Sequence, residues 1–489
     1  MSRYSFLRIG ALLLLLLTAV FAVSACGSVP EDHTHQYIER EVAPTCTEGG
    51  YCLWVCACGD SYREDEISPL GHTMGSNNRC AVCDAILPVT DDSYFAFELL
   101  DDGTYEIRAN RADAMPSVVR LPDIHDGKPV TRIASSGFAG CRSMAGILIP
   151  SCVTHIGDGA FLNCDVLTAV VFDEGSLLSG IGENAFRNCT GLTDIAIPSG
   201  VTAIGAYAFG NCRNLVSLTF GENSRLTNIG DSAFYYCRDL ADITIPSGVT
   251  AIGAQAFRMC FNLGTVNFAE GSQLTSIGEQ AFYSCCRLMR LTIPQGVTSI
   301  GAQAFSDCYR LVEVYNLSDS FQIKAQQGEP YALVVHTSAD EPSNILTDEN
   351  GYVFYENGDT CRLLGYEGTD TVLSLPESFH GKQYTIHKYA FSGFTELRRV
   401  TIPSGVTEIG SRAFYECCRL ETVVFGENSE LKSIGLFAFY VCGSLTDVTC
   451  DATDWRVSPP YFFGRFNESA PLTADNLTSA YTDCYWKRD

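Results

Sequence analysis

Apolar residues recur at fixed intervals over most of the chain. From Gly137 onward, phenylalanines follow one another at alternating intervals of 23 and 25 residues. The first series consists of Phe138, Phe161, Phe186, Phe209, Phe234, Phe257, Phe282 and Phe305. A cysteine stands three residues after each of them, at Cys141, Cys164, Cys189, Cys212, Cys237, Cys260, Cys285 and Cys308. Self-similarity of this kind indicates a repeat protein, in which each unit packs only on its neighbours.

Each unit of the repeat reads as a short strand, a turn and a return to the core. In the unit that begins at Leu192, Ile195 and Ile197 are two residues apart, so both face inward from a strand while Asp194 faces outward. A Pro-x-Gly turn follows, and every second unit carries instead a longer turn of the F-G-E-N-S type. A single unit leaves half of its apolar side chains exposed, so units must stack at about 4.8 Å per strand to bury them. The sequence therefore predicts a β-rich repeat solenoid.

The strand motif L-x-x-I-x-I-P and the motif A-F-x-x-C together resemble the leucine-rich repeats of the BspA-like type, known from bacterial and protist surface proteins. The resemblance covers most of residues 94–450 and includes a second, shorter series at Phe391, Phe414 and Phe439. It departs from the pattern at Phe394, which stands where a cysteine is expected. The resemblance implies a leucine-rich repeat solenoid that lies on a cell surface and binds other macromolecules.

The period and its interruptions divide the chain into six segments. We expect a signal peptide at 1–26, a Cys/His module at 27–90, a first repeat array with its N-terminal cap at 91–316, a connecting insert at 317–355, a second array at 356–450 and a C-terminal cap at 451–489. Similar lead-ins precede the two arrays, starting at Leu121-Pro122 and Leu375-Pro376. We predict that these lead-ins form caps of short strands, because the open end of a solenoid must be covered to stay soluble.

The first 26 residues resemble the signal peptide of a bacterial lipoprotein. Arg3 and Arg8 precede an apolar run over residues 9–23, which is the pattern of a secretory signal. The following string V-S-A-C-G-S resembles a lipobox, which implies that Cys26 is diacylated and becomes the mature N-terminus. No other stretch is long enough to span a bilayer, so we expect contact with the membrane through a lipid anchor only. Cleavage without lipidation is the alternative.

Cysteine and histidine are concentrated between residues 27 and 90. The candidate ligands for a structural zinc ion are His35, Cys46, Cys56, Cys58, His72, Cys80 and Cys83. Their Cys-x-Cys and Cys-x-x-Cys spacings suit a tetrahedral zinc site, and a segment this short needs such a staple. The segment also resembles short zinc-ribbon-like modules in surface proteins of gut anaerobes, for which structural zinc is the usual interpretation. An exported protein can also oxidise these thiols, so disulfides are the alternative.

Charge and motif content exclude several classes of function. The chain carries 57 acidic and 32 basic side chains, a formal net charge of −25, which makes nucleic acid an unsuitable partner. It contains no G-x-S-x-G, H-E-x-x-H or P-loop motif. We therefore predict a protein that is not an enzyme and uses no organic cofactor. The repeated cysteines are expected to pack as small hydrophobic residues.

The outward strand positions of the first array form the candidate binding face. This face comprises Asp194, Ser217, Thr219, Asp242, Thr244, Thr265, Asn267, Arg290, Thr292 and Tyr315. Most of these side chains are small or hydroxylated and few are charged, which suits a flat contact with another macromolecule. We predict an extracellular protein or glycan as the partner, as for adhesins of the resembling family. A structural scaffold of the cell envelope without a dedicated ligand is the alternative.

Overall fold

The computed structural model describes residues 37–42, 50–56, 61–67, 87–323, 332–450, 455–458, 468–469, 473, 477–478 and 485–488. The chain separates into two units, one of residues 1–75 with 79–85 and one of residues 76–78 with 86–489. The first unit contains the strands β1 (Tyr37–Val42), β2 (Gly50–Cys56) and β3 (Ser61–Ile67). These three strands pair antiparallel in the order β1-β2-β3.

Short strands begin the second unit, as the first lead-in predicts. They are β4 (Phe95–Leu99), β5 (Tyr105–Ala109), β6 (Val118–Arg120), β7 (Ile124–His125) and β8 (Lys128–Ile133), together with the 3-10 turns η1 (Asp92–Tyr94) and η2 (Ala112–Ala114). β4 and β5 form an antiparallel pair, and β5 then pairs in parallel with β8. This cap therefore continues the sheet of the repeats that follow.

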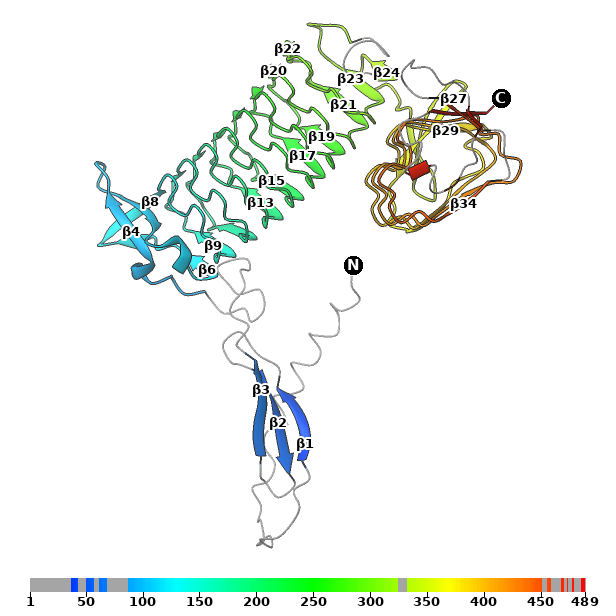
Figure 1. Cartoon of the computed structure of the whole chain (residues 1–489). Helices are drawn as coiled ribbons and strands as arrows, with labels where there is room; N and C mark the ends of the chain where they lie inside the picture. The colour runs from blue at the N-terminus through cyan, green and yellow to red at the C-terminus, as the bar shows by residue number, and fades with distance from the viewer. Residues whose placement is uncertain are drawn as a thin grey trace, which may run out of the picture. The chain divides into compact units, whose positions relative to one another are not determined.

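Each repeat of the first array contributes a four-residue strand and a two-residue strand. The four-residue strands are β9 (Gly146–Ile149), β11 (Ala169–Phe172), β13 (Asp194–Ile197), β15 (Ser217–Phe220), β17 (Asp242–Ile245), β19 (Thr265–Phe268), β21 (Arg290–Ile293) and β23 (Glu313–Asn316). The two-residue strands are β10 (His155–Ile156), β12 (Gly180–Ile181), β14 (Ala203–Ile204), β16 (Asn228–Ile229), β18 (Ala251–Ile252), β20 (Ser276–Ile277) and β22 (Ser299–Ile300). Figure 1 shows the four-residue strands following one another along one side of this array. The predicted repeat solenoid is confirmed.

The two-residue strands, and not the four-residue ones, form the continuous sheet. They pair in parallel from β22 back to β10, and the sheet continues into β8, β5 and β4. The four-residue strands pair instead in separate groups, namely β6-β9-β11, β13-β15, β17-β19 and β21-β23-β24. Each break follows a unit that carries the longer turn. The sequence pattern predicts only a return of apolar residues to the core at the two-residue strands, so this sheet is an additional finding.

A column of stacked phenylalanine rings runs through the core of the first array. From Phe138 to Phe305, neighbouring ring centroids lie 5.0–5.5 Å apart and the ring planes are within 16° of parallel. The rings are at most 3% exposed. One phenylalanine therefore buries its faces against the same residue of the preceding and following repeats, which explains the fixed spacing in the sequence.

The repeated cysteines form a second buried column beside the rings. The thiol of Cys164 donates to the backbone carbonyl oxygen of Phe138 at 3.0 Å, and the same contact to the preceding repeat recurs up to Cys308 and Phe282. All these cysteines are free and buried. The expectation that they pack as small core residues is confirmed, and the thiol adds a second hydrogen bond to a carbonyl oxygen that already accepts from the backbone N–H of the cysteine in its own repeat.

Glycine is required where successive repeats approach most closely. Gly205 follows the two-residue strand β14, and a Cβ atom at this position would lie 2.6 Å from the backbone nitrogen of Glu183 in the preceding repeat. Any side chain would force the two turns apart. The glycine of each V-T-x-I-G segment therefore sets how closely the repeats can stack.

The insert between the arrays is rich in strands, as predicted. It contains β24 (Val334–His336) and β25 (Ile345–Thr347), followed by β26 (Tyr352–Asn357) and β27 (Thr360–Tyr366). β24 pairs in parallel with β23 and so extends the first array, whereas β25, β26 and β27 pair antiparallel. The predicted boundary at residue 355 lies inside β26, because this strand already belongs to the sheet of the second array.

The second array repeats the plan of the first one. Its strands are β28 (Val372–Ser374), β29 (Tyr384–Ile386), β30 (Arg399–Ile402), β31 (Val406–Ile409), β32 (Thr422–Phe425), β33 (Ser433–Ile434) and β34 (Asp447–Thr449). Here the strands β28-β30-β32-β34 form one unbroken parallel sheet. Three further strands follow, β35 (Trp455–Ser458), β36 (Glu468–Ser469) and β37 (Tyr485–Arg488). β37 pairs antiparallel with β33, the position expected of a C-terminal cap.

Candidate binding surfaces

The predicted binding face consists of the outward positions of the four-residue strands in the first array. Eight of its residues are exposed, and they are Asp194, Ser217, Thr219, Asp242, Thr244, Thr265, Asn267 and Arg290. Parallel pairing places Asp194 beside Ser217, and Asp242 beside Thr265. The face therefore presents rows of short polar side chains in register.

The end of this face is covered, so the prediction for Tyr315 is wrong. Tyr315 is only 7% exposed and Thr292 is half-buried. The Tyr315 ring stacks on His336 of β24 at a centroid distance of 4.4 Å, and its hydroxyl donates to the backbone carbonyl oxygen of Glu341 at 3.2 Å. The segment that follows the array folds back over its last four-residue strand, and a local sequence pattern does not reveal such a contact.

A buried carboxylate holds this covering segment in place. Glu313 is fully buried and accepts hydrogen bonds from Arg290 Nε at 2.6 Å, His336 Nε2 at 2.9 Å, Ser343 Oγ at 2.8 Å and the Asn344 amide at 2.8 Å. Burial raises the pKa of Glu313, but the hydrogen bonds outweigh burial and leave the pKa below its usual value. Three of these four donors belong to residues 336–344, so their hydrogen bonds to the Glu313 carboxylate hold this segment against β23.

Two hollows open on the binding face, each where the pairing of four-residue strands is broken. One, of about 310 Å³, lies between β11 and β13 and is lined by Phe172, Pro198 and Thr219, among others. The other, of about 460 Å³, lies between β19 and β21 and is lined by Phe268 and Thr292, among others. The expected flat face is therefore interrupted by shallow depressions that combine part of an aromatic ring with hydroxyl groups.

A second candidate surface lies on the turns that carry the A-F-x-x-C motif. Arginine and tyrosine side chains pair there across repeats, with Arg187 over the Tyr207 ring at 4.8 Å and Arg258 over the Tyr283 ring at 4.5 Å. Tyr207 also contacts Tyr235 at a centroid distance of 6.1 Å. We call these five residues the aromatic edge. Arginine and tyrosine are enriched at the centres of protein interfaces, which makes this edge a binding candidate that sequence reasoning missed.

One residue of the aromatic edge, Tyr207, is held in an unfavourable backbone conformation. The residue two positions before each core phenylalanine has a positive φ, and Tyr207 occupies this position with a φ of 53°. Asparagine tolerates this conformation well, as Asn184 does at the same place in the preceding repeat, whereas tyrosine does not. An aromatic residue at a position that disfavours it was the available sequence signal for Tyr207.

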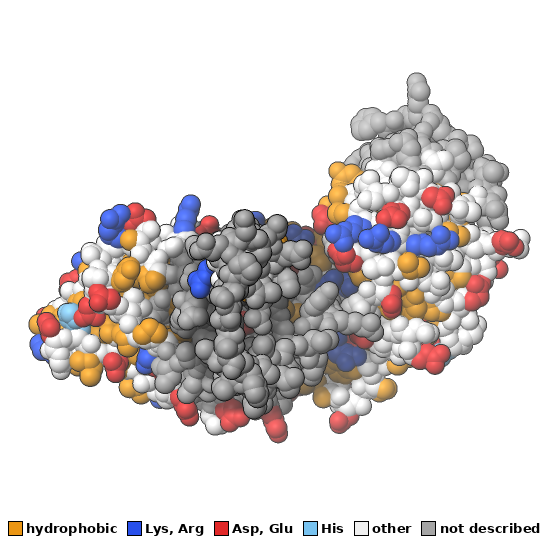
Figure 2. All heavy atoms as spheres, turned by 90° about the horizontal axis from the view of Figure 1, so that it is seen from below, with side chains coloured by type: hydrophobic (Ala, Val, Ile, Leu, Met, Phe, Trp, Pro, Cys, Tyr) orange, Lys and Arg blue, Asp and Glu red, His pale blue; other side chains and the backbone are white. Residues whose placement is uncertain are grey.

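Apolar side chains do not join into one large patch on the face that Figure 2 displays. They are scattered among polar and charged side chains of both signs. Single exposed apolar residues are normal on protein surfaces.

The predicted lipidation site Cys26 lies outside the described residues. So do the candidate zinc ligands His35, Cys46, Cys58, His72, Cys80 and Cys83, while Cys56 ends β2 and its side chain is not described. Within the described ranges, no group of three or more His, Cys, Asp or Glu side chains could hold a metal ion. No helix in the same part of the chain is long and apolar enough to cross a membrane.

Solved structures with similar folds come from several bacteria. A leucine-rich repeat protein of T. pallidum is 29% identical over 46% of this chain and 91% of its own, with a TM-score of 0.37. A leucine-rich cell surface protein of Faecalibacterium prausnitzii A2-165 is 22% identical over 75% of this chain and 95% of its own, with a TM-score of 0.35. The pneumococcal vaccine antigen PcpA is 17% identical over 75% of this chain and 82% of its own, with a TM-score of 0.28.

Family comparison gives a match over more than half of the chain. The family described as BspA type leucine rich repeat region matches residues 118–235, 227–326 and 373–487 in six copies. Among curated proteins, none matches this chain. The matched residues contain the phenylalanines of both arrays and the paired strands of the repeats, whereas β1 to β5 and β24 to β27 lie outside the match. The chain belongs to the BspA-type leucine-rich repeat family.

Proposed function

We propose that this protein is displayed on a bacterial cell surface and binds an extracellular protein or glycan through the binding face of the first array. The observation that carries the proposal is the row of exposed, mostly uncharged polar side chains held in register by parallel strands. Such side chains can exchange hydrogen bonds with water for hydrogen bonds with a partner at little desolvation cost. The two hollows add places where a sugar ring or a side chain can enter.

Several repeats must contribute to this interface together. A standard protein–protein interface buries roughly 800 Å² on each partner, which is more than one strand of four residues can supply. The central repeats, which carry Thr244 and Thr265, should therefore matter most. A bulky charged residue there would prevent close contact over the neighbouring repeats as well.

The proposal is tested with the variant Thr244→Lys, Thr265→Lys. Binding of the purified protein to immobilised mucin glycoproteins and extracellular matrix proteins is measured for wild type and variant. The matched control is Ala203→Lys, Asn228→Lys, which adds the same charge at exposed positions of the two-residue strands. Loss of binding in the first variant alone, with unchanged Tm, supports the proposal. If the first variant binds as well as the control variant and the wild type, the binding face is ruled out.

The aromatic edge is a second candidate for the same activity, because its arginine–tyrosine pairs offer strong contacts to a protein partner. Replacing Tyr207 and Tyr283 with serine in the same binding assay separates the two surfaces. Loss of binding in this variant, with retention in the lysine variant, would move the binding site to the aromatic edge. The opposite result would leave it on the four-residue strands.

Anchoring and metal content complete the proposal. Cys26 would attach the chain to the membrane by lipid, and growth with labelled palmitate should label the wild type but not Cys26→Ser. The cysteines and histidines of residues 27–90 would hold structural zinc. Chelation should then release titratable thiols together with zinc, whereas disulfides would yield thiols only after reduction.

A further inference from the structure

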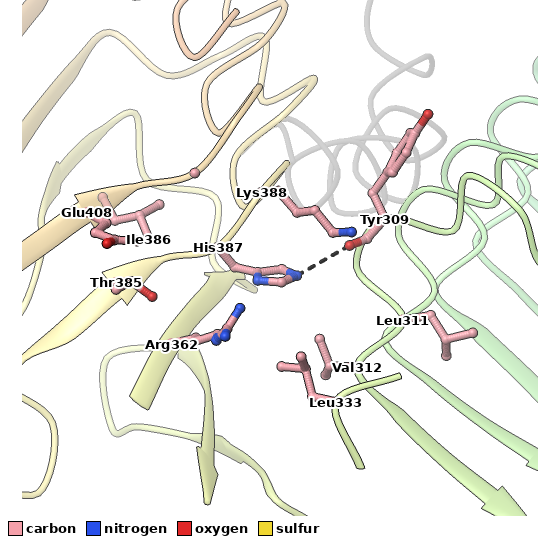
Figure 3. Close-up of a pocket in the computed structure, with 11 residues that line it drawn as sticks. Tyr309, Leu311, Val312, Leu333, Arg362, Thr385, Ile386, His387, Lys388 and Glu408 are labelled. Carbon is pink, nitrogen blue, oxygen red and sulfur yellow. Dashed lines mark hydrogen bonds between the residues drawn. The ribbon is translucent and has the colours of Figure 1, made fainter. Parts of the chain in front are cut away.

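A cavity of about 390 Å³ lies where the end of the first array meets the start of the second. Tyr309, Leu311 and Val312 of the first array form one wall, with Leu333 beside them. Arg362 on β27 and the segment 385–388, which begins within β29, form the other wall. Figure 3 shows Arg362 and Lys388 on either side of the His387 ring, whose Nε2 lies 3.3 Å from the Tyr309 carbonyl oxygen. The cavity has the volume of a small-ligand site.

The walls of this cavity are held by buried packing. Val312 is 1% exposed and packs in one apolar cluster with Val353, Tyr355 and Leu364, which come from the strands that precede the second array. Ile386, at the back of the cavity, is 1% exposed. The side chains around the cavity are therefore fixed by the core on both sides, and the opening does not depend on a single surface loop.

Two cationic side chains, Arg362 and Lys388, line this cavity, and Glu408 is the acidic side chain among its lining residues. Among the described residues, neither Arg362 nor Lys388 forms an ion pair, although the chain as a whole is strongly acidic. Arg310, next to Tyr309, is 9% exposed; its Nε has no hydrogen-bond partner within the described part of the chain. Its guanidinium packs against Gly365 of the second array and meets Met289 Sδ at 3.5 Å.

These cations also act on one another. Burial and the charge of Arg362 both lower the pKa of Lys388, and burial followed by the charges of Arg362 and Lys388 lowers the pKa of His387. The charge of Asp307 raises the pKa of Lys388, and the charge of Glu367 raises the pKa of Arg310. Among the described residues, neither carboxylate lies within ion-pair distance of these cations. Glu408 lines the cavity but is exposed. Arg362 and Lys388 are half-buried, so an anion bound next to them would relieve their mutual repulsion.

We propose that this cavity binds a small organic carboxylate. The carboxylate would lie beside the His387 ring, within reach of Arg362 on one side and Lys388 on the other, and its apolar part would pack on Leu311, Val312 and Leu333. Guanidinium and ammonium groups form strong charge-assisted hydrogen bonds with carboxylates. An inorganic anion would fill only part of the volume and leave the apolar wall uncovered. The proposal concerns a site separate from the binding face and is independent of the proposed function.

The test is isothermal titration calorimetry of the purified protein with three probes: hexanoate, hexanol and inorganic phosphate. Hexanoate should bind, while hexanol should bind about tenfold more weakly or not at all because it lacks the charge. The variant Arg362→Gln, Lys388→Gln should lose hexanoate binding by at least about tenfold, since each of these cations would donate to the carboxylate. Its stability without ligand should be unchanged or higher, because like charges have been removed.

The matched control is Arg398→Gln, Lys432→Gln, which removes the same charge from exposed positions of the second array and should keep hexanoate binding. NMR of histidine-labelled protein gives an independent readout, in which hexanoate should shift the ring signal of His387. Equal binding of hexanol and hexanoate, or unchanged binding in the cavity variant, would overturn the proposal. Phosphate binding as tight as hexanoate binding would overturn the assignment to an organic carboxylate.

Discussion

The phenylalanine column should carry a large share of the stability of the first array. In Phe234→Ala, a fully buried ring is lost from between Phe209 and Phe257, whose centroids lie 5.3 and 5.2 Å away. Replacing a buried phenylalanine by alanine costs about 3–5 kcal/mol, and loss of an aromatic pair costs about 1 kcal/mol beyond buried area. Both neighbouring rings are fixed by their own repeats and cannot close the gap. We therefore expect a cost of about 5 kcal/mol.

The end of the column provides the matched comparison. Among the described residues Phe305 stacks on one ring, that of Phe282 at 5.5 Å, so Phe305→Ala should cost about 1 kcal/mol less than Phe234→Ala. The exposed Val216 is the negative control, and Val216→Ala should change stability by less than about 0.5 kcal/mol. Urea unfolding followed by circular dichroism gives the free energies, and hydrogen exchange locates the weakened repeats. If Phe234→Ala costs less than Phe305→Ala, the stacked column does not couple the repeats.

Three further predictions concern buried polar groups. Glu313→Ala should destabilise the protein by about 3 kcal/mol, measured by urea unfolding, and should speed limited proteolysis within residues 332–347. The control Glu421→Ala removes an exposed carboxylate and should change stability by about 0.5 kcal/mol or less. Burial, and then the charge of Arg362, lowers the pKa of His387 from 6.5 to about 3. The neutral form of His387 therefore contributes stability above pH 6.5 that is lost as the pH falls toward 3, and His387→Gln should reduce the loss of stability between pH 7 and pH 5 by about 2 kcal/mol. An unchanged dependence of stability on pH in this variant would contradict the prediction. Burial raises the pKa of Cys212 to about 12, so iodoacetamide at pH 8 should label the exposed Cys418 well before Cys212 in peptide mass mapping.

The interior of the repeats could be predicted from the sequence because its residues recur at fixed offsets. The inward positions Ile195 and Ile197, the phenylalanine column and the buried cysteines all follow from a period that a single chain displays many times. Burial of this kind depends on local spacing and on contact with the next copy of the same unit. Both conditions are visible in one sequence.

The sheets and the covered end of the face could not be predicted in the same way. A strand of two residues such as β14 has too few positions to show an alternating pattern, so its continuous pairing was missed. Tyr315 occupies an outward position like that of Thr292, and only a segment more than 20 residues later buries it. The cavity that we propose as a carboxylate site is lined by residues from Tyr309 to Gly410, and no local motif joins them.

The alternation of turns has a consequence for how such a protein can change its length. In the first array, the pairing of the four-residue strands is broken after every second repeat, so the smallest block with matching ends is a pair of repeats, such as the stretch from Phe186 to Phe234. Gene duplication or deletion of whole pairs leaves every junction as it was. Inserting or deleting a single repeat would place two turns of the same length next to each other and would change the spacing of the hollows along the binding face. Natural length variants of this array should therefore differ by even numbers of repeats.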